Sequence, residues 1–321
     1  MEIQRVNTLN EKHRYLGAGR HVPNFFIVGA AKSGTTSLYH YLKQHPEIYM
    51  SPVKEPKYFL ASINKFPHNG PGDIEVDKKI IRTWDEYLKL FSNASVEKCI
   101  GEASCGYLYY CELVAPSIKR ISPEAKIIIV LRNPVERAFS AYCYLFREGR
   151  ETLSFEEALK IEEERKKRNY EFIWFYKDLG FYYCGVKAYL NTFGEENVKI
   201  CLYDDFKRNP LGVIKDIFRF LGVDENFVPD ISIKHNVSQI AKNKSFQNLL
   251  LDYNHPLKKL FRSLLLNAVG KENTEKLVNY FRNVNSVKMK PKTRRYLAEF
   301  YRDDILMLQS LIRRDLSDWL K

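Results

Sequence analysis

Residues 25–36 decide the fold, and they read Phe25-Phe26-Ile27-Val28 followed by Gly29-Ala30-Ala31-Lys32-Ser33-Gly34-Thr35-Thr36. The apolar run predicts a buried strand, and the glycine-containing turn after it predicts the start of a helix. The first N–H groups of a helix have no partner within the helix, and the helix dipole adds partial positive charge there. The stretch therefore predicts an anion site at a strand-to-helix turn.

The side chains of this turn suit a phosphate group. Gly34 lets the backbone approach a ligand closely, and Lys32 adds a full charge because its ordinary pKa is about 10.4. The turn adds three hydroxyl donors, from Ser33, Thr35 and Thr36. An ordinary glycine-containing turn is the alternative, but strand, lysine, hydroxyls and helix together favour a phosphate site.

The lysine is displaced from the position it has in nucleoside-triphosphate loops. Those loops follow the pattern G-x-x-x-x-G-K-[ST]. Gly29 and Gly34 have that spacing and Thr36 takes the last position, but Thr35 stands where the lysine belongs. The lysine is three residues earlier, at Lys32, which points toward a phosphate-bearing donor other than ATP. A P-loop kinase that uses ATP–Mg²⁺ on a small metabolite is the alternative.

The loop resembles the P-K-S-G-T-T segment of sulfotransferases that use 3′-phosphoadenosine 5′-phosphosulfate (PAPS). The resemblance implies that Lys32 bridges the 5′-phosphate and the sulfuryl group, with PAPS as co-substrate and no metal. It also implies a set of 5′-phosphate ligands: Ser33, Gly34, Thr35 and Thr36. Some members place an adenine-stacking aromatic residue next, where this chain has Ser37. The adenine must therefore stack elsewhere.

A second segment supports the same family independently. Residues 126–131 are apolar enough to predict a buried strand, and Arg132 follows at its carboxyl end, where open α/β sheets bind ligands. Asn133 and Pro134 predict the start of a helix. Arg132 and Ser140 match the family's 3′-phosphate motif, R-[ND]-P-x-x-x-x-x-S, and the planar fork of arginine suits a phosphate. A surface ion-pair arginine and a helix-packing serine are the alternative.

The segment 54–59, Lys-Glu-Pro-Lys-Tyr-Phe, resembles the E-x-x-[FY]-F segment of heparan-sulfate-type and related bacterial sulfotransferases. There the glutamate is the general base for the acceptor, which implies that role for Glu55. A carboxylate is a poor base until burial raises its pKa, and Lys54 and Lys57 would oppose that rise. A solvated turn is the alternative. The histidine of the cytosolic branch, in a K-T-H-L stretch, has no counterpart here.

Further matches extend the resemblance over about residues 22–222. Residues 100–108 are similar to a G-E-K-[ST]-P-x-Y segment, but Ala103 replaces the lysine that serves acidic glycans in the heparan-sulfate branch. This makes a uronic-acid polymer a less favoured acceptor. Residues 180–190 are similar to a family helix whose tyrosine lies near the adenine, which implies that role for Tyr183. A core aromatic residue is the alternative.

The chain is predicted to be a single sulfotransferase domain over residues 1–321. Its core, 22–222, is expected to be a P-loop-like three-layer α/β/α fold with a central parallel sheet. From about residue 232 to 321 the pattern predicts a mostly helical subregion, with helices at 245–268, 272–282 and 293–315. The family's K-G-R type clamp for the 3′-phosphate is absent there. Candidate substitutes are Lys242, Lys244, Lys288 and Lys290.

Composition agrees with this interpretation. The net charge is +12, from 51 basic and 39 acidic residues, which suits an anionic donor. The basic residues are scattered and form no nucleic-acid-binding module, and no apolar stretch approaches the ~20 residues of a membrane helix. Six cysteines without C-x-x-C pairing indicate reduced thiols in a cytoplasmic protein. The expected acceptor is a hydroxyl-bearing glycan, glycolipid or secondary metabolite.

Overall fold

The structure, a computed structural model, describes residues 21–232 and 288–321. Its centre is one sheet of five parallel strands in the order β2-β3-β1-β4-β5. The strands are β1 (Phe25–Gly29), β2 (Ile48–Met50), β3 (Cys99–Ala103), β4 (Lys126–Leu131) and β5 (Val198–Leu202). The predicted strands at 25–28 and 126–131 are thus confirmed.

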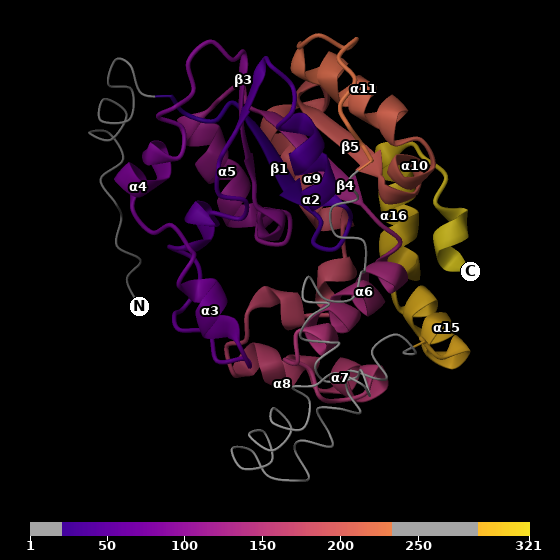
Figure 1. The fold of residues 1–321 in the computed structure, drawn as a ribbon. Helices are drawn as coiled ribbons and strands as arrows, with labels where there is room; N and C mark the ends of the chain where they lie inside the picture. Colours follow the sequence, from indigo (N-terminus) through magenta and orange to yellow (C-terminus); the bar gives the residue numbers. More distant parts are fainter. Residues whose placement is uncertain (1–20, 233–287) are drawn as a thin grey trace, which may run out of the picture.

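Helices connect the strands and cover both faces of the sheet (Figure 1). The α-helices are α2 (Thr35–Leu42), α3 (Asp73–Asp77), α4 (Trp84–Lys89), α5 (Cys111–Ile121), α6 (Pro134–Arg147), α7 (Phe155–Lys160), α8 (Glu162–Lys167), α9 (Tyr183–Phe193), α10 (Tyr203–Arg208), α11 (Pro210–Leu221), α15 (Pro291–Phe300) and α16 (Arg302–Ile312). The 3₁₀ turns are η1 (Tyr58–Leu60), η2 (Cys105–Tyr107), η3 (Phe172–Trp174), η4 (Asp178–Gly180), η5 (Glu195–Asn197) and η6 (Ser317–Leu320).

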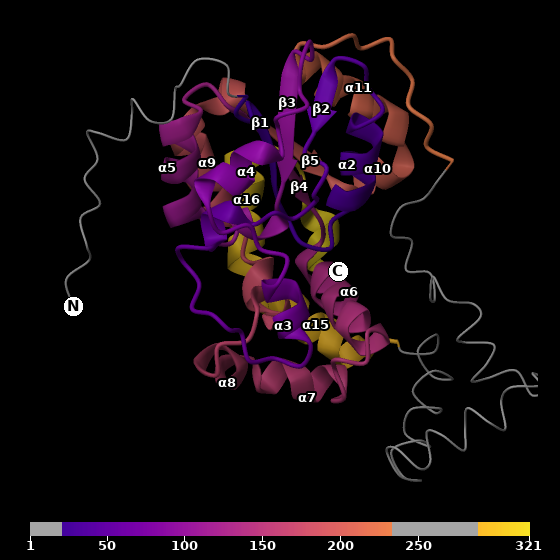
Figure 2. The same cartoon turned by 60° about the vertical axis from the view of Figure 1, so that its left-hand side comes forward.

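The strands are apolar along their whole length because both faces of the sheet are buried. In β4, Ile127 and Ile129 enter the core under α5, α9 and α16, while Ile128 and Val130 enter the core under α2 and α11. Figure 2 shows the sheet between these two helical layers. The predicted three-layer α/β/α arrangement is confirmed.

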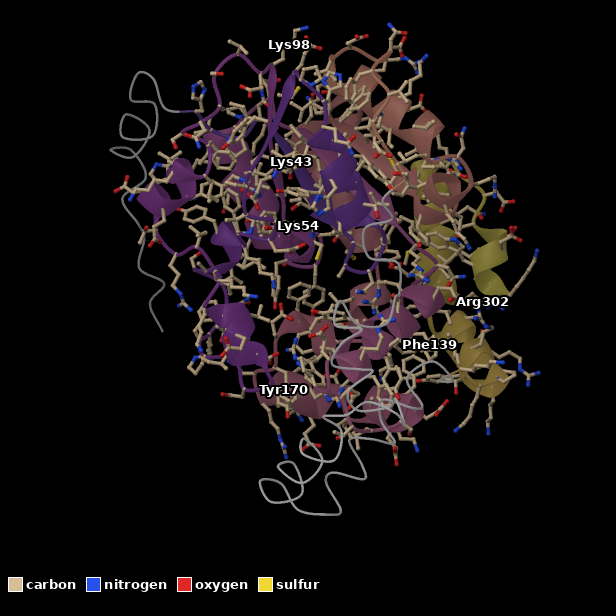
Figure 3. All side chains as sticks on the ribbon, in the orientation of Figure 1. Lys43, Lys54, Lys98, Phe139, Tyr170 and Arg302 are labelled. Carbon is tan, nitrogen blue, oxygen red and sulfur yellow. The ribbon has the colours of Figure 1, made fainter. Side chains whose placement is uncertain are left out.

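All five strands run in one direction, so their carboxyl ends meet at one edge of the sheet. The residues that directly follow the strands are Ala30, Ser51, Ser104, Arg132 and Tyr203. Lys98, just before β3, and Lys54, just after β2, lie at opposite ends of the sheet (Figure 3). This edge is where open parallel sheets bind ligands.

The predicted helix at 293–315 is wrong in its extent, because two helices, α15 and α16, occupy this part of the chain. They are separated at Tyr301, which is fully buried and donates its hydroxyl to the Lys177 carbonyl at 2.8 Å. Anchoring Tyr301 in the core turns the chain there. α16 ends at Ile312, and the residue that caps it, Arg313, has a left-handed φ of 52°. The helices predicted at 245–268 and 272–282 lie outside the described residues.

The C-terminal helix pair, α15 and α16, contacts the sheet domain through the buried carboxylate of Asp304. Asp304 accepts the Tyr182 and Tyr183 amide groups, at 2.8 Å and about 3.2 Å, and so caps the start of α9. Among the described residues, no helix is both long enough and apolar enough to cross a membrane.

Candidate active site

The turn between β1 and α2 is shaped for close approach by a ligand. Gly34 has a φ of 90°, and a Cβ atom there would lie 3.1 Å from the Tyr203 ring, so a larger residue would be strained and crowded. Gly34 is also the N-cap of α2, with no side chain capping the helix and no acidic residue in its first turn. The first N–H groups of α2 are therefore available to an anion.

Lys32 projects from this turn toward α6. Its Nζ lies 4.2 Å from the centre of the Tyr144 ring, a cation–π contact. The pKa of Lys32 is lowered to about 8, first by burial and then by the positive charges of Arg147, Arg132 and Lys54. The positive charges around this turn disfavour the charged form of Lys32, and a bound anion would stabilise it.

Arg132 joins the second predicted motif to the first, 100 residues away in sequence. Its Nη1 donates to the Lys32 carbonyl at 3.1 Å, and its guanidinium carbon lies 4.8 Å from the centre of the Tyr203 ring. Glu136 is 3.9 Å away, a loose ion pair. The structure therefore brings the loop and the strand end together.

Ser140 is half-buried on α6, one helical turn from Glu136 and one from Tyr144. Residues four apart lie on one face of a helix. Because Glu136 contacts Arg132 and Tyr144 contacts Lys32, this face of α6 is turned toward the two motifs. Ser140 lies on the same face, and its role at the 3′-phosphate stays a prediction.

Tyr182, the neighbour of the predicted Tyr183, contacts Arg132 at the end of β4. The Tyr182 hydroxyl donates to the Arg132 carbonyl at 3.0 Å, whereas Tyr183 lies against Lys187, whose Nζ is 5.3 Å from its ring centre. The Ser33 hydroxyl is buried and makes no well-formed hydrogen bond among the described residues. Burial raises the pKa of Tyr182 to about 12, and the nearby Ser33 hydroxyl opposes that rise. An unsatisfied buried hydroxyl beside cations fits a phosphate ligand. The role of Tyr183 at the adenine stays a prediction.

Glu55 lies on the loop after β2 and turns back onto the end of β3. Its amide donates to the Ala103 carbonyl at 2.9 Å. Its carboxylate accepts the Cys105 amide, at 3.1 Å on Oε2, and the Lys54 ammonium, at 2.7 Å on Oε1. Among the described residues, the Cys105 amide alone binds Oε2, so this oxygen can still accept a proton. The side chain is 24% exposed, which leaves it open to an acceptor.

The pKa of Glu55 is decided by its lysine neighbours. Burial would raise the pKa, but the charges of Lys54 and Lys57 and the Cys105 hydrogen bond together hold it below the ordinary value. The rise that we expected burial to provide is thus outweighed. Glu55 is ionised at neutral pH and can accept a proton, at the cost of being a weaker base.

Cys105 connects the two halves of the site. Its amide donates to Glu55 at 3.1 Å, and its carbonyl oxygen packs against Gly29, where a Cβ atom would lie 3.2 Å away. The Lys32 loop and Glu55 therefore both lie against the start of η2. Sequence reasoning missed Tyr144 and Arg147. The signal for both was helical spacing, since they follow Ser140 by four and seven residues on α6.

Two of the lysines predicted to replace the 3′-phosphate clamp, Lys288 and Lys290, are among the described residues, and neither has a described contact with this site. Lys290 binds Glu156 at 3.1 Å, and Lys288 is exposed. Lys242 and Lys244 lie outside the described residues. Within residues 21–232 and 288–321, no group of three or more His, Cys, Asp or Glu side chains could hold a metal ion.

Comparison with known proteins identifies the family. A model described as "Sulfotransferase family" matches residues 23–227. A sulfotransferase from Alicyclobacillus acidocaldarius, known from its crystal structure, is 39% identical with a TM-score of 0.75, and the match covers 94% of this chain and 100% of that one. Mouse carbohydrate sulfotransferase 15 is 27% identical over 253 residues, which cover 64% of this chain and 44% of that protein. Mouse bifunctional heparan sulfate N-deacetylase/N-sulfotransferase 4 is 25% identical, covering 94% and 31%.

The chain belongs to the sulfotransferase family. The family model spans well over half of the chain, and it includes the loop, Glu55, Arg132 and Ser140. These findings support sulfuryl transfer and not the kinase alternative. The chain spans less than half the length of the curated relatives described above.

Proposed function

We propose that the chain transfers the sulfuryl group of PAPS to a hydroxyl, or an amine, of a glycan, glycolipid or small metabolite. One observation carries this proposal: the Lys32 loop and Glu55 meet at Cys105, at the carboxyl edge of the sheet. A Cβ atom on Gly29 of the loop would lie 3.2 Å from the Cys105 carbonyl oxygen, and the Cys105 amide donates to Oε2 of Glu55 at 3.1 Å. A cation that can hold a leaving phosphate and a carboxylate that can take a proton thus share one space.

In the proposed reaction the acceptor oxygen attacks the sulfur of PAPS, and the bond from sulfur to the 5′-phosphate oxygen breaks. The acceptor proton passes to Oε2 of Glu55. The electron pair of the broken bond stays on the 5′-phosphate, where Lys32 and the first N–H groups of α2 stabilise the added charge. Such transfer depends mainly on positioning and charge stabilisation, which a rigid sheet edge supplies.

The 3′-phosphate of the donor is assigned to Arg132 and Ser140, on the family motif. The guanidinium of Arg132 lies against Tyr203 and is only loosely paired with Glu136, so it can bind a second anion. Spent donor, 3′-phosphoadenosine 5′-phosphate (PAP), should therefore bind on its own.

Calorimetric titration with PAP tests donor binding first. We expect micromolar affinity for wild type, and a loss of about 10- to 100-fold for Arg132→Ala, because charge-assisted hydrogen bonds are worth about 1.5–3 kcal/mol each. Arg302→Ala is the matched control, since Arg302 pairs with Glu299 on the surface of α16. Binding of ATP–Mg²⁺ but not of PAP would contradict the proposal.

PAP affinity is expected to fall as pH rises above about 8. The pKa of free Lys32 is lowered to about 8, so its charge is lost through this range, while a bound phosphate raises the pKa and favours the charged form. Binding near pH 8 should therefore take up protons. Titrations between about pH 7 and pH 9 avoid the phosphate's own pKa near 6.

The control for this pH dependence is Lys32→Met, which should bind PAP weakly and with little change over the same range. The heat of wild-type binding should also vary with the ionisation enthalpy of the buffer. A wild-type affinity that is constant from about pH 7 to pH 9 would show that Lys32 does not contact the donor.

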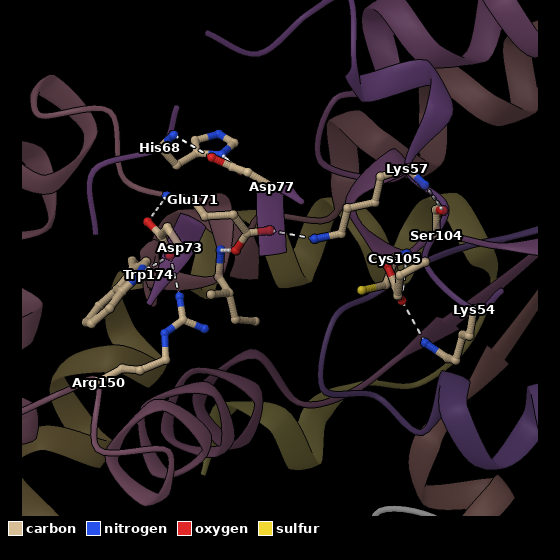
Figure 4. Close-up of polar contacts among 12 residues, drawn as sticks. Lys54, Lys57, His68, Asp73, Asp77, Ser104, Cys105, Arg150, Glu171 and Trp174 are labelled. Atoms are coloured by element: carbon tan, nitrogen blue, oxygen red, sulfur yellow. Dashed lines mark hydrogen bonds and ion pairs between the residues drawn. The ribbon is translucent and has the colours of Figure 1, made fainter. Parts of the chain in front are cut away.

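The acceptor rim is assigned to residues 62–77, a stretch that contains several proline and glycine residues. Asp73, at the start of α3, is fully buried and fixes this segment by accepting the Gly70 amide at 2.8 Å and the Trp174 indole N–H at 2.9 Å. Arg150 forms an ion pair with the same carboxylate (Figure 4). A rim that is fixed at Asp73 supports recognition of a defined acceptor.

The place of action is proposed to be the reducing cytoplasm. All six cysteines are free, and three of them, Cys99, Cys111 and Cys201, are buried. Free buried thiols support a compartment that does not form disulfides.

A further inference from the structure

The loop that carries Glu55 has an unusual backbone. Glu55 and Lys57 both have positive φ, 63° and 54°, a conformation that residues other than glycine seldom adopt. The loop is held by the Lys57 amide, which donates to the Ser104 hydroxyl at 3.1 Å, and by the Ile81 amide, which donates to the Pro56 carbonyl at 3.0 Å. This conformation presents two opposite charges, Glu55 and Lys57, from neighbouring positions.

Lys57 does not pair with Glu55. Its side chain is 10% exposed, and its Nζ donates to Oε1 of Glu171 at 2.7 Å, 114 residues further along the chain. Its Nζ also lies 4.9 Å from the centre of the Phe172 ring. Figure 4 shows the Lys57 side chain reaching toward Glu171, while Lys54 lies on the other side of Cys105.

Glu171 is itself fixed. Its side chain is 3% exposed, and its second oxygen accepts the Ile173 amide at 3.0 Å. Its own amide donates to Asp73 at 2.9 Å, the carboxylate that organises the acceptor rim. The contact between Lys57 and Glu171 therefore joins the Glu55 loop to the acceptor rim through buried groups.

The buried Lys57 ammonium has two carboxylates near it. Burial lowers its pKa, but Glu171 first and Glu55 second outweigh this effect and hold the pKa above the ordinary value. A buried charge without a partner is costly. If Glu171 lost its charge, Glu55 would be the remaining carboxylate that acts on Lys57.

We propose that Glu171 is a positioning residue that holds the Lys57 ammonium away from Glu55, so that the carboxylate of Glu55 stays open toward the acceptor. This inference rests on the proposed function, in which Glu55 takes the acceptor proton. It assigns neither Glu171 nor Lys57 a contact with the reacting atoms.

The pH dependence of the variants depends on every charged or titratable group near Glu55. Lys54 and Lys57 face it from its own loop, Cys105 faces it from η2, and Glu102 acts from β3. Of these, Lys57 is the group whose partner can be removed without touching the hydrogen bonds of Glu55. The Glu171→Gln variant does this with little change in shape.

The test compares Glu171→Gln with wild type in acceptor turnover, its pH profile and PAP affinity. We expect kcat to fall about tenfold and the acid limb of the pH profile to move to lower pH, because Lys57 then stabilises ionised Glu55. PAP affinity should stay within about twofold of wild type. The double variant Lys57→Gln with Glu171→Gln should recover most of kcat, with its acid limb above that of wild type, because the charge of Lys57 is gone.

A matched control is Glu151→Gln, which breaks another buried pair, with Arg165 at 2.7 Å. It should lower thermal stability in the same way as Glu171→Gln but leave the pH profile in place. If Glu171→Gln does not fold, Lys57→Gln alone should still be active with a raised acid limb. Loss of its activity to the level of Glu55→Gln would overturn the inference.

Two failures can be told apart. In the first, wild type is active and Glu55→Gln is inactive, but Glu171→Gln has the same kcat and pH profile as wild type. This result would overturn the role of Glu171 alone. A double variant no better than Glu171→Gln would do the same. Wild type without PAPS-dependent turnover, or Glu55→Gln as active as wild type, would overturn the proposed function and this inference with it.

Discussion

Replacing Lys32 by alanine is expected to lower kcat/KM by about 10³-fold and to weaken PAP binding as well. Loss of one donor that stabilises transition-state charge costs about 10²–10³ in rate, and a charge-assisted hydrogen bond adds to the binding of the ground state. The substitution should affect both kcat/KM and PAP binding, because Lys32 is assigned to the 5′-phosphate, which is charged before and after transfer. Steady-state kinetics together with calorimetry with PAP measure the two effects separately.

Lys43→Ala is the matched control for this variant. Lys43 lies at the other end of α2 and is exposed. Replacing it by alanine therefore removes one positive charge near the same helix and leaves the loop unchanged. Its kinetics should equal those of wild type. Equal effects of the two substitutions would show that general positive charge, rather than the placement of Lys32, drives donor binding.

Glu55→Gln is expected to lower kcat by about 10²–10⁴-fold while PAP affinity stays unchanged. The amide keeps the shape of the side chain and can still accept the Cys105 amide, but it cannot take a proton. In wild type the acid limb of the pH profile should lie below the ordinary range of a glutamate, because its neighbours lower the pKa of Glu55. The pH profile of kcat/KM measures this limb.

The control for Glu55→Gln is Glu299→Gln, an exposed carboxylate paired with Arg302. It should leave turnover and PAP affinity unchanged. A chain that binds PAP but shows no turnover in either the wild type or the Glu55→Gln form would be a donor-binding protein without catalysis. That result would contradict the role of Glu55 and the proposed reaction.

The strands and the start of each site segment could be predicted because they depend on local order. A short apolar run bounded by turn residues favours a buried strand, and a glycine-containing turn followed by hydroxyl residues favours the start of a helix. For this reason β1 and β4 were predicted from the sequence and are confirmed. Lys32 and Arg132 meet at the strand ends, and their roles at the donor stay predictions. The break at Tyr301 was missed, because a buried hydroxyl contact, and not a helix-breaking residue, sets it.

The electrostatic state of the site could not be predicted in the same way. The sequence placed Lys54 and Lys57 beside Glu55 but did not say which of them would pair with it. In the structure Lys54 forms an ion pair with Glu55 at 2.7 Å, while Lys57 forms an ion pair with Glu171 at 2.7 Å. The partner that decides this choice is 114 residues away and carries no local signal.

The sequence by itself therefore determined the parallel sheet, the phosphate-binding turn and the identity of the charged groups, because these follow from periodicity and residue type over a few positions. Only the tertiary structure decided which charges meet. The parallel strands bring Lys32, Glu55 and Arg132 to one edge. Burial there lowers the pKa of Lys32, and the charges of Arg147 and Arg132, which are distant in the chain, lower it further. Coulomb interactions depend on separation in space, and the fold alone sets that separation.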